Sequence, residues 1–133
     1  MYQVKAREIH DAGGKIKRVV LDYELKKKLN RELNNGRDPD PSGQHKLKEA
    51  VAREYSVAVV EGSFVIPDVR IEYQDRDGNE ARVDLEYLTE TYRHGDISSK
   101  AQAGFRLYAP HDQASRLHRV IDRHHIMTDI LSI

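Results

Sequence analysis

The sequence predicts a small domain of the α/β or α+β class, and three observations lead to this prediction. Two segments in the first half of the chain, 18–34 and 42–55, carry apolar residues at helical spacing. The centre of the chain changes to the alternating spacing of strands. Residues 112–131 return to a helical pattern. A chain of 133 residues can bury one core, so we expect a single domain over 1–133.

The first predicted helix covers residues 18–34. Asp22 is a candidate cap near its start, and Asn34-Asn35-Gly36 is a typical helix end. Residues 36–44 are dense in Gly, Pro and Asp and are predicted to form the most mobile internal loop. A second helix is expected over about 42–55.

The centre of the chain predicts short strands and a hairpin. Residues 57–60 and 64–66 favour two buried strands, or one bent strand broken at Gly62. Two longer segments, 69–73 and 83–87, alternate apolar and polar residues as half-buried strands do.

A turn joins these two strands. Asp75-Arg76-Asp77-Gly78-Asn79 contains Asp-Gly and Gly-Asn steps, which favour a hairpin. If the hairpin closes, Asp68, Asp84 and Glu86 share one face of the sheet, and the apolar residues share the other.

The last third of the chain is predicted to be mainly helical. Residues 96–105 form a helix capped by Asp96. Residues 106–109 either continue this helix or add a strand. A C-terminal helix is expected over 111–133, with a break near His124-His125.

The composition excludes several classes of protein. The chain has no cysteine, so it offers neither disulfides nor thiolate zinc sites. It has no apolar run long enough to span a membrane and no signal-peptide core, so we expect a cytoplasmic protein without a membrane partner.

The charge is unevenly distributed although the net charge is zero. Residues 1–37 contain ten Lys and Arg against five Asp and Glu, whereas 61–96 contain ten acids against four arginines. This suits a protein that holds phosphates with one part and a divalent metal with another. A chance fluctuation on a highly charged surface gives the same pattern.

Three carboxylates are candidate metal ligands: Asp68, Asp84 and Glu86. Mg²⁺ and Mn²⁺ prefer oxygen ligands, and a metal held in this way can activate water for phosphodiester hydrolysis. The competing interpretation is that Asp68 marks a strand end and that the other two acids are solvated.

The constellation resembles the PD-(D/E)xK nuclease superfamily over roughly residues 18–108. Pro67-Asp68 matches the "PD" step, Asp84-Leu85-Glu86 takes the place of "(D/E)xK", and Glu24 matches an acid of the preceding helix. The resemblance implies a restriction-endonuclease-like core: a helix, then a mixed sheet of three to four strands with a hairpin, flanked by helices. More narrowly, the chain looks like the nuclease-like domain of the replication-relaxation family of plasmids and mobile elements.

One position departs from the superfamily pattern. The strand lysine is absent, because Glu86 or Leu88 occupies its place. Lys100 lies on the next predicted helix, where the equivalent lysine of some superfamily members is found. Gln102 is similar to a glutamine on that helix in certain nuclease branches. The resemblance implies that Lys100, Glu86 and Glu24 serve catalysis.

Basic residues could contact the phosphate backbone of DNA. Lys26, Lys27 and Arg31, together with Gln102, are the candidate nucleic-acid ligands, although a solvated helix face explains the basic run equally well. The apolar end of the chain, 127–133, is a candidate surface for a homodimer through the C-terminal helix.

Three functions follow from these observations. The first is a Mg²⁺- or Mn²⁺-dependent DNA endonuclease. The second is the same fold with lapsed chemistry, which binds DNA or protein in replication or transfer of a mobile element. The third is an interaction protein that uses its C-terminal helix.

Overall fold

The computed structural model describes all residues, 1–133, and contains five helices and seven strands. Five strands form one mixed sheet in the order β1-β4-β5-β6-β7. Their bounds are β1 (Lys15–Leu21), β4 (Val69–Gln74), β5 (Glu80–Tyr87), β6 (Arg106–Ala109) and β7 (Ile130–Ser132). β1, β4 and β5 pair antiparallel, whereas β5–β6 and β6–β7 pair parallel. The mixed α/β class is confirmed, but the main sheet is larger than the three to four strands expected.

The N-terminal region differs from the prediction. A helix, α1 (Tyr2–Asp11), precedes β1, and the apolar spacing predicts neither element. The predicted helix 18–34 is wrong in its first turn, because residues 18–21 lie in β1 and α2 (Asp22–Asn35) starts only at Asp22. The two valines of that turn pair with β4. Since β-branched side chains suit strands, this tertiary pairing overrides the helical spacing.

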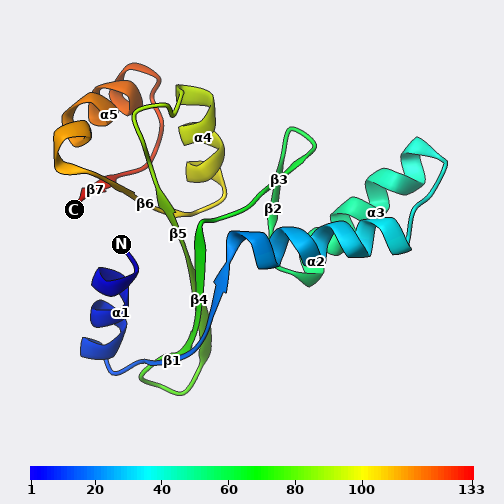
Figure 1. Cartoon of the computed structure of the whole chain (residues 1–133), viewed down its shortest axis with the longest axis horizontal. Coiled ribbons are helices and arrows are strands. Elements are labelled where there is room, and N and C mark those ends of the chain that lie inside the picture. The colour runs from blue at the N-terminus through cyan, green and yellow to red at the C-terminus, as the bar shows by residue number, and fades with distance from the viewer.

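The second predicted helix is confirmed as α3 (Pro41–Glu54). Asp40 caps it, since the Asp40 carboxylate accepts a hydrogen bond from the backbone N–H of Ser42. The end of the predicted loop 36–44 therefore belongs to the helix, and 36–40 form the connection. α2 and α3 lie side by side and extend away from the sheet (Figure 1).

A separate two-stranded sheet follows α3. It consists of β2 (Ala58–Val60) and β3 (Ser63–Val65), which pair antiparallel, so the two-strand alternative is confirmed. Gly62 lies in the turn between them with φ +78°. Glycine adopts this conformation without the steric cost that a Cβ atom imposes.

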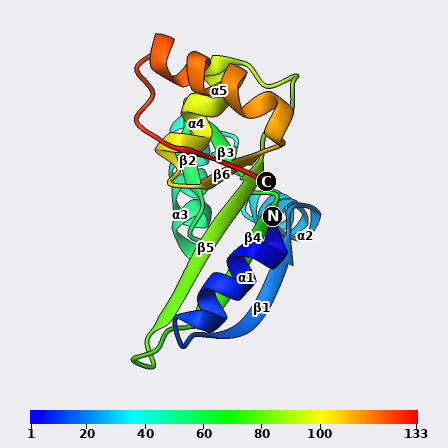
Figure 2. The same ribbon diagram turned by 90° about the vertical axis from the view of Figure 1, so that its left-hand side faces the viewer.

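The β4–β5 hairpin confirms the predicted alternation. Its turn is closed by the Asp75 N–H, which donates to the Asn79 carbonyl. Ile71 and Leu85 are fully buried on one face of the hairpin, in a cluster with Ile9 of α1. α1 covers this face, on the side of the sheet away from α2 and α3 (Figure 2). The opposite face is left to the charged residues.

The helix predicted at 96–105 is present as α4 (His94–Gln102) and starts slightly earlier. Asp96 is not the N-cap residue that the sequence predicted but the third residue of the helix. Its carboxylate accepts a hydrogen bond from the backbone N–H of Arg93, the N-cap residue, at 3.2 Å. This is one half of a capping box. Of the two alternatives for residues 106–109, the strand is correct, because they form β6.

The predicted C-terminal helix 111–133 is wrong in its second half. α5 (His111–Arg123) ends at the expected break near His124-His125, and the chain returns to the sheet as β7. The reason is burial: Ile130 is 3% exposed and packs into the cluster beneath α4 and α5. None of the helices combines the length and the apolar character needed to cross a lipid bilayer.

Candidate functional site

Glu86 is the most buried charged side chain of the protein, at 1% exposure. It lies near the end of β5, where the polar face of the hairpin meets the loop before α4. Its Oε1 accepts the backbone N–H of Asp68 at 2.9 Å. Its Oε2 accepts the Tyr92 hydroxyl at 2.8 Å and lies 2.9 Å from Lys100 Nζ. The carboxylate is therefore held by three donors from three different segments.

Lys100 reaches this carboxylate from α4. Its Nζ also donates to the backbone carbonyl of Ile66 at 2.8 Å, so the ammonium lies between two oxygens. The helix is fixed by Ile97, which is fully buried in the α4–α5 cluster. The Lys100 side chain is 19% exposed, so it connects a buried carboxylate to the surface.

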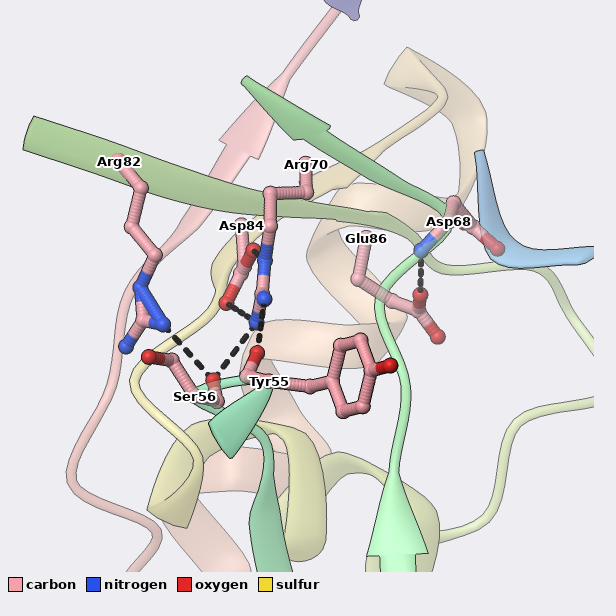
Figure 3. A network of polar contacts seen from close by, with 7 residues as sticks. All are labelled: Tyr55, Ser56, Asp68, Arg70, Arg82, Asp84 and Glu86. Carbon is pink, nitrogen blue, oxygen red and sulfur yellow. Dashed lines mark hydrogen bonds and ion pairs between the residues drawn. The ribbon is translucent and has the colours of Figure 1, made fainter. Parts of the chain in front are cut away.

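Asp68 precedes β4 and lies half-buried beside Glu86. Its Oδ2 accepts the backbone N–H of Tyr87 at 2.8 Å, which fixes the carboxylate against β5. Its carbonyl accepts the N–H of Asp22, the first residue of α2. Figure 3 shows Glu86 reaching the backbone of Asp68 rather than its carboxylate. Of the predicted site residues, Asp68, Glu86 and Lys100 are thus brought together.

Asp84 does not join these residues, because it forms an ion pair with Arg70. Arg70 stands opposite Asp84 in the register of β4 and β5 and contacts both of its carboxylate oxygens, at 2.8 and 3.2 Å. Both side chains are almost buried, at 5% and 10% exposure. Arg70 also donates to the carbonyls of Tyr55 and Ser56, in the turn after α3 (Figure 3). Arg70 therefore attaches this turn to the sheet, and Asp84 holds Arg70 in place.

The three predicted metal ligands do not form one cluster. No group of three Asp, Glu or His side chains in the protein lies close enough to hold a metal ion. The strand parity that places Asp84 and Glu86 on one face is correct, but parity does not fix where the side chains point. Arg70 decides this, because a bidentate guanidinium–carboxylate pair uses both oxygens of Asp84.

Burial dominates the electrostatics of the site. It raises the pKa of the Glu86 carboxyl above its ordinary value, while the contacts with Lys100 and Tyr92 oppose the rise. Burial also raises the pKa of the Tyr92 hydroxyl, and its hydrogen bond to Glu86 adds to this. Tyr92 consequently keeps its proton at neutral pH and remains a donor to Glu86.

The remaining predicted residues lie outside this cluster. Glu24 forms an ion pair with Arg18 at 3.4 Å and makes no hydrogen bond or ion pair with the residues of this cluster. Lys26 pairs with Asp22 at 3.6 Å on the exposed surface of α2. The others are exposed: Lys27, Arg31 and Gln102.

Sequence reasoning missed two important contributors. Arg70 could have been found, because the hairpin register sets a cation directly opposite Asp84. Tyr92 gave no such signal, since it reaches Glu86 from a loop whose path no periodic pattern describes.

Comparison of the chain with protein-family models, with curated proteins and with solved structures finds no match.

Proposed function

We propose that the protein is a metal-dependent nuclease that hydrolyses phosphodiester bonds in DNA. The observation that carries this proposal is the contact of Lys100 with Glu86 beside Asp68. These are the two carboxylates and the cation that such chemistry requires, and they converge from β5, the start of β4 and α4. Their convergence depends on elements far apart in the sequence, so it is not a product of local charge patterning.

Asp68 and Glu86 are suitable ligands for Mg²⁺ or Mn²⁺. Magnesium is commonly held by only one or two protein carboxylates together with water and substrate oxygens. Asp68 has one carboxylate oxygen occupied by the Tyr87 N–H, which leaves the other for a ligand. Asp84 does not fit this role, because the Arg70 guanidinium binds both of its oxygens, whereas in Glu86 only Oε2 is paired with a cation, the ammonium of Lys100.

The protein's own groups have separate tasks in this proposal. A divalent metal held by Asp68 and Glu86 would supply a water of lowered pKa and would neutralise charge on the phosphate. Lys100 provides a positive charge at the edge of the site for the negative charge that develops on the phosphate oxygens. Tyr92 and the Asp68 N–H orient Glu86, and Asp68 is in turn oriented by the Tyr87 N–H.

A second function is favoured by a specific observation. Glu86 already accepts three donors, as a carboxylate with a structural role does, and Asp84 is neutralised. The second proposal is accordingly a nuclease-like fold with lapsed chemistry that binds DNA or protein, in the replication or transfer of a plasmid or mobile element. In either case, Lys26, Lys27, Arg31 and Gln102 remain proposed contacts to nucleic acid.

Plasmid nicking tests the first proposal. Purified protein is incubated with supercoiled DNA and Mn²⁺, beside the variants Asp68→Asn and Glu86→Gln. We expect nicking that falls about 100-fold or more in each variant, because each removes a charge that acts on the transition state. Asp77→Asn, in the exposed hairpin turn, is the matched control and should nick as the unmodified protein does.

Other outcomes separate the alternatives. Nicking that persists in both Asp68→Asn and Glu86→Gln would assign it to a contaminant and refute the nuclease. DNA retained at low salt without nicking supports the binding module. A protein without DNA affinity that forms dimers dependent on residues 127–133 supports the interaction protein; Met127 is 94% and Ile133 40% exposed.

A further inference from the structure

The ammonium of Lys100 occupies a position that resembles a metal site. It lies 2.9 Å from a carboxylate oxygen of Glu86 and 2.8 Å from the backbone carbonyl oxygen of Ile66. A carboxylate and a carbonyl are the oxygen donors that hard divalent cations prefer. The Lys100 ammonium therefore marks a position where two oxygen atoms already bind a positive charge.

Lys100 is the only cation that forms an ion pair with Glu86. The other nearly buried cation of this face, Arg70, is bound to Asp84. Glu86 is almost completely shielded from water. If Lys100 leaves, the buried Glu86 carboxylate loses its only ion-pair partner, so it either takes up a proton or accepts another cation.

We propose that Lys100 and a divalent metal ion compete for this position, with the Ile66 carbonyl as an additional ligand beside Glu86 and Asp68. The inference rests on the proposed function for the choice of Mg²⁺ or Mn²⁺. Lys100 is tethered to α4 at the edge of the site and is partly exposed, so its ammonium can move outward when the metal enters. In the protein without metal, the Lys100 ammonium then occupies the proposed metal position and blocks it.

Metal affinity measured by calorimetry tests this competition without any need for cleavage. Lys100→Met keeps the length and apolar character of the side chain but removes the ammonium. We expect it to bind Mn²⁺ about tenfold or more tightly than the unmodified protein, because no cation has to be displaced. Lys46→Met, on the exposed side of α3, is the matched control and should leave the affinity unchanged.

A second measurement uses the unmodified chain, so it does not depend on how well the variant folds. Addition of Mg²⁺ should accelerate hydrogen exchange at the backbone amides of α4, since the helix loses its tie to Glu86 and Ile66. Unchanged or slower exchange in α4 contradicts the inference. So does a Lys100→Met protein that binds Mn²⁺ no more tightly, or an absence of metal binding in both proteins.

The two proposals can fail separately. Nicking by the unmodified protein together with unchanged Mn²⁺ affinity in Lys100→Met would overturn the competition and leave the nuclease in place. Tighter Mn²⁺ binding by Lys100→Met, in a protein that never nicks DNA, would retain the competition and reject the nuclease.

Discussion

Two ion pairs occupy the same face of the β4–β5 hairpin but differ in construction. Arg70 and Asp84 come from neighbouring strands, use both carboxylate oxygens and are nearly buried. Lys100 and Glu86 join a helix to a strand through one carboxylate oxygen, and the lysine is partly exposed. A bidentate guanidinium pair is rigid, whereas an ammonium is a point charge on a flexible chain. The first pair is therefore suited to structure, and the second to exchange with a ligand.

The difference also appears in what each cation holds besides its carboxylate. Arg70 donates to the carbonyls of Tyr55 and Ser56 and so connects the turn after α3 to the sheet. Ser56 has a positive φ of 54°, which is uncommon for a residue other than glycine, and Arg82 also donates to its carbonyl. Lys100 holds one carbonyl, that of Ile66, next to the site itself. Substitution of Arg70 thus tests how the turn after α3 is attached to the sheet, and substitution of Lys100 tests how the candidate site is held.

The largest effect is expected from Arg70→Met. This change leaves Asp84 as a buried charge without a partner and the Tyr55 carbonyl without its donor, whereas the Ser56 carbonyl keeps Arg82, so it should destabilise the protein by about 3–5 kcal/mol. Urea unfolding measures the loss. The double variant Arg70→Met/Asp84→Leu should recover most of it, because the buried charge is also removed; equal loss in both variants would contradict a dominant role of the pair.

A smaller loss is expected from Lys100→Met in the absence of metal. Glu86 keeps the Tyr92 hydroxyl and the Asp68 N–H as donors, so the loss should be about 2 kcal/mol, the scale of one hydrogen bond to a charged group. The same urea experiment measures it, and addition of Mn²⁺ should reduce the loss. A loss as large as that of Arg70→Met would show that the two pairs are equally structural.

The smallest effect is expected from Lys26→Ala, which removes an exposed pair with Asp22 at 3.6 Å. Solvent and salt screen such a pair, so the free energy of unfolding should change by less than about 0.5 kcal/mol. A loss above about 1 kcal/mol at moderate salt would indicate that α2 relies on surface charge more than its exposure suggests.

The sequence predicted the regions whose pattern depends on neighbours along the chain. Helix α3, the β4–β5 hairpin and its turn follow from spacing and turn residues. The helix predicted at 18–34 failed at its start because residues 18–21 pair with β4, which is about fifty residues away in the chain. The predicted helix 111–133 failed because Ile130 is buried beside β6.

The candidate site divides in the same way. The sequence by itself determined that Asp84 and Glu86 share one face of the hairpin, with Asp68 directly before it, since side chains alternate along every strand. The resemblance to the PD-(D/E)xK superfamily added the prediction that Lys100 stands in for the absent strand lysine. Only the tertiary structure decided that Asp84 forms an ion pair with Arg70. It also decided that Glu86 binds Lys100 and Tyr92. The reason is physical: periodicity fixes the face on which a side chain lies, but its partner is chosen by burial, because a charge removed from water must find the nearest opposite charge or donor.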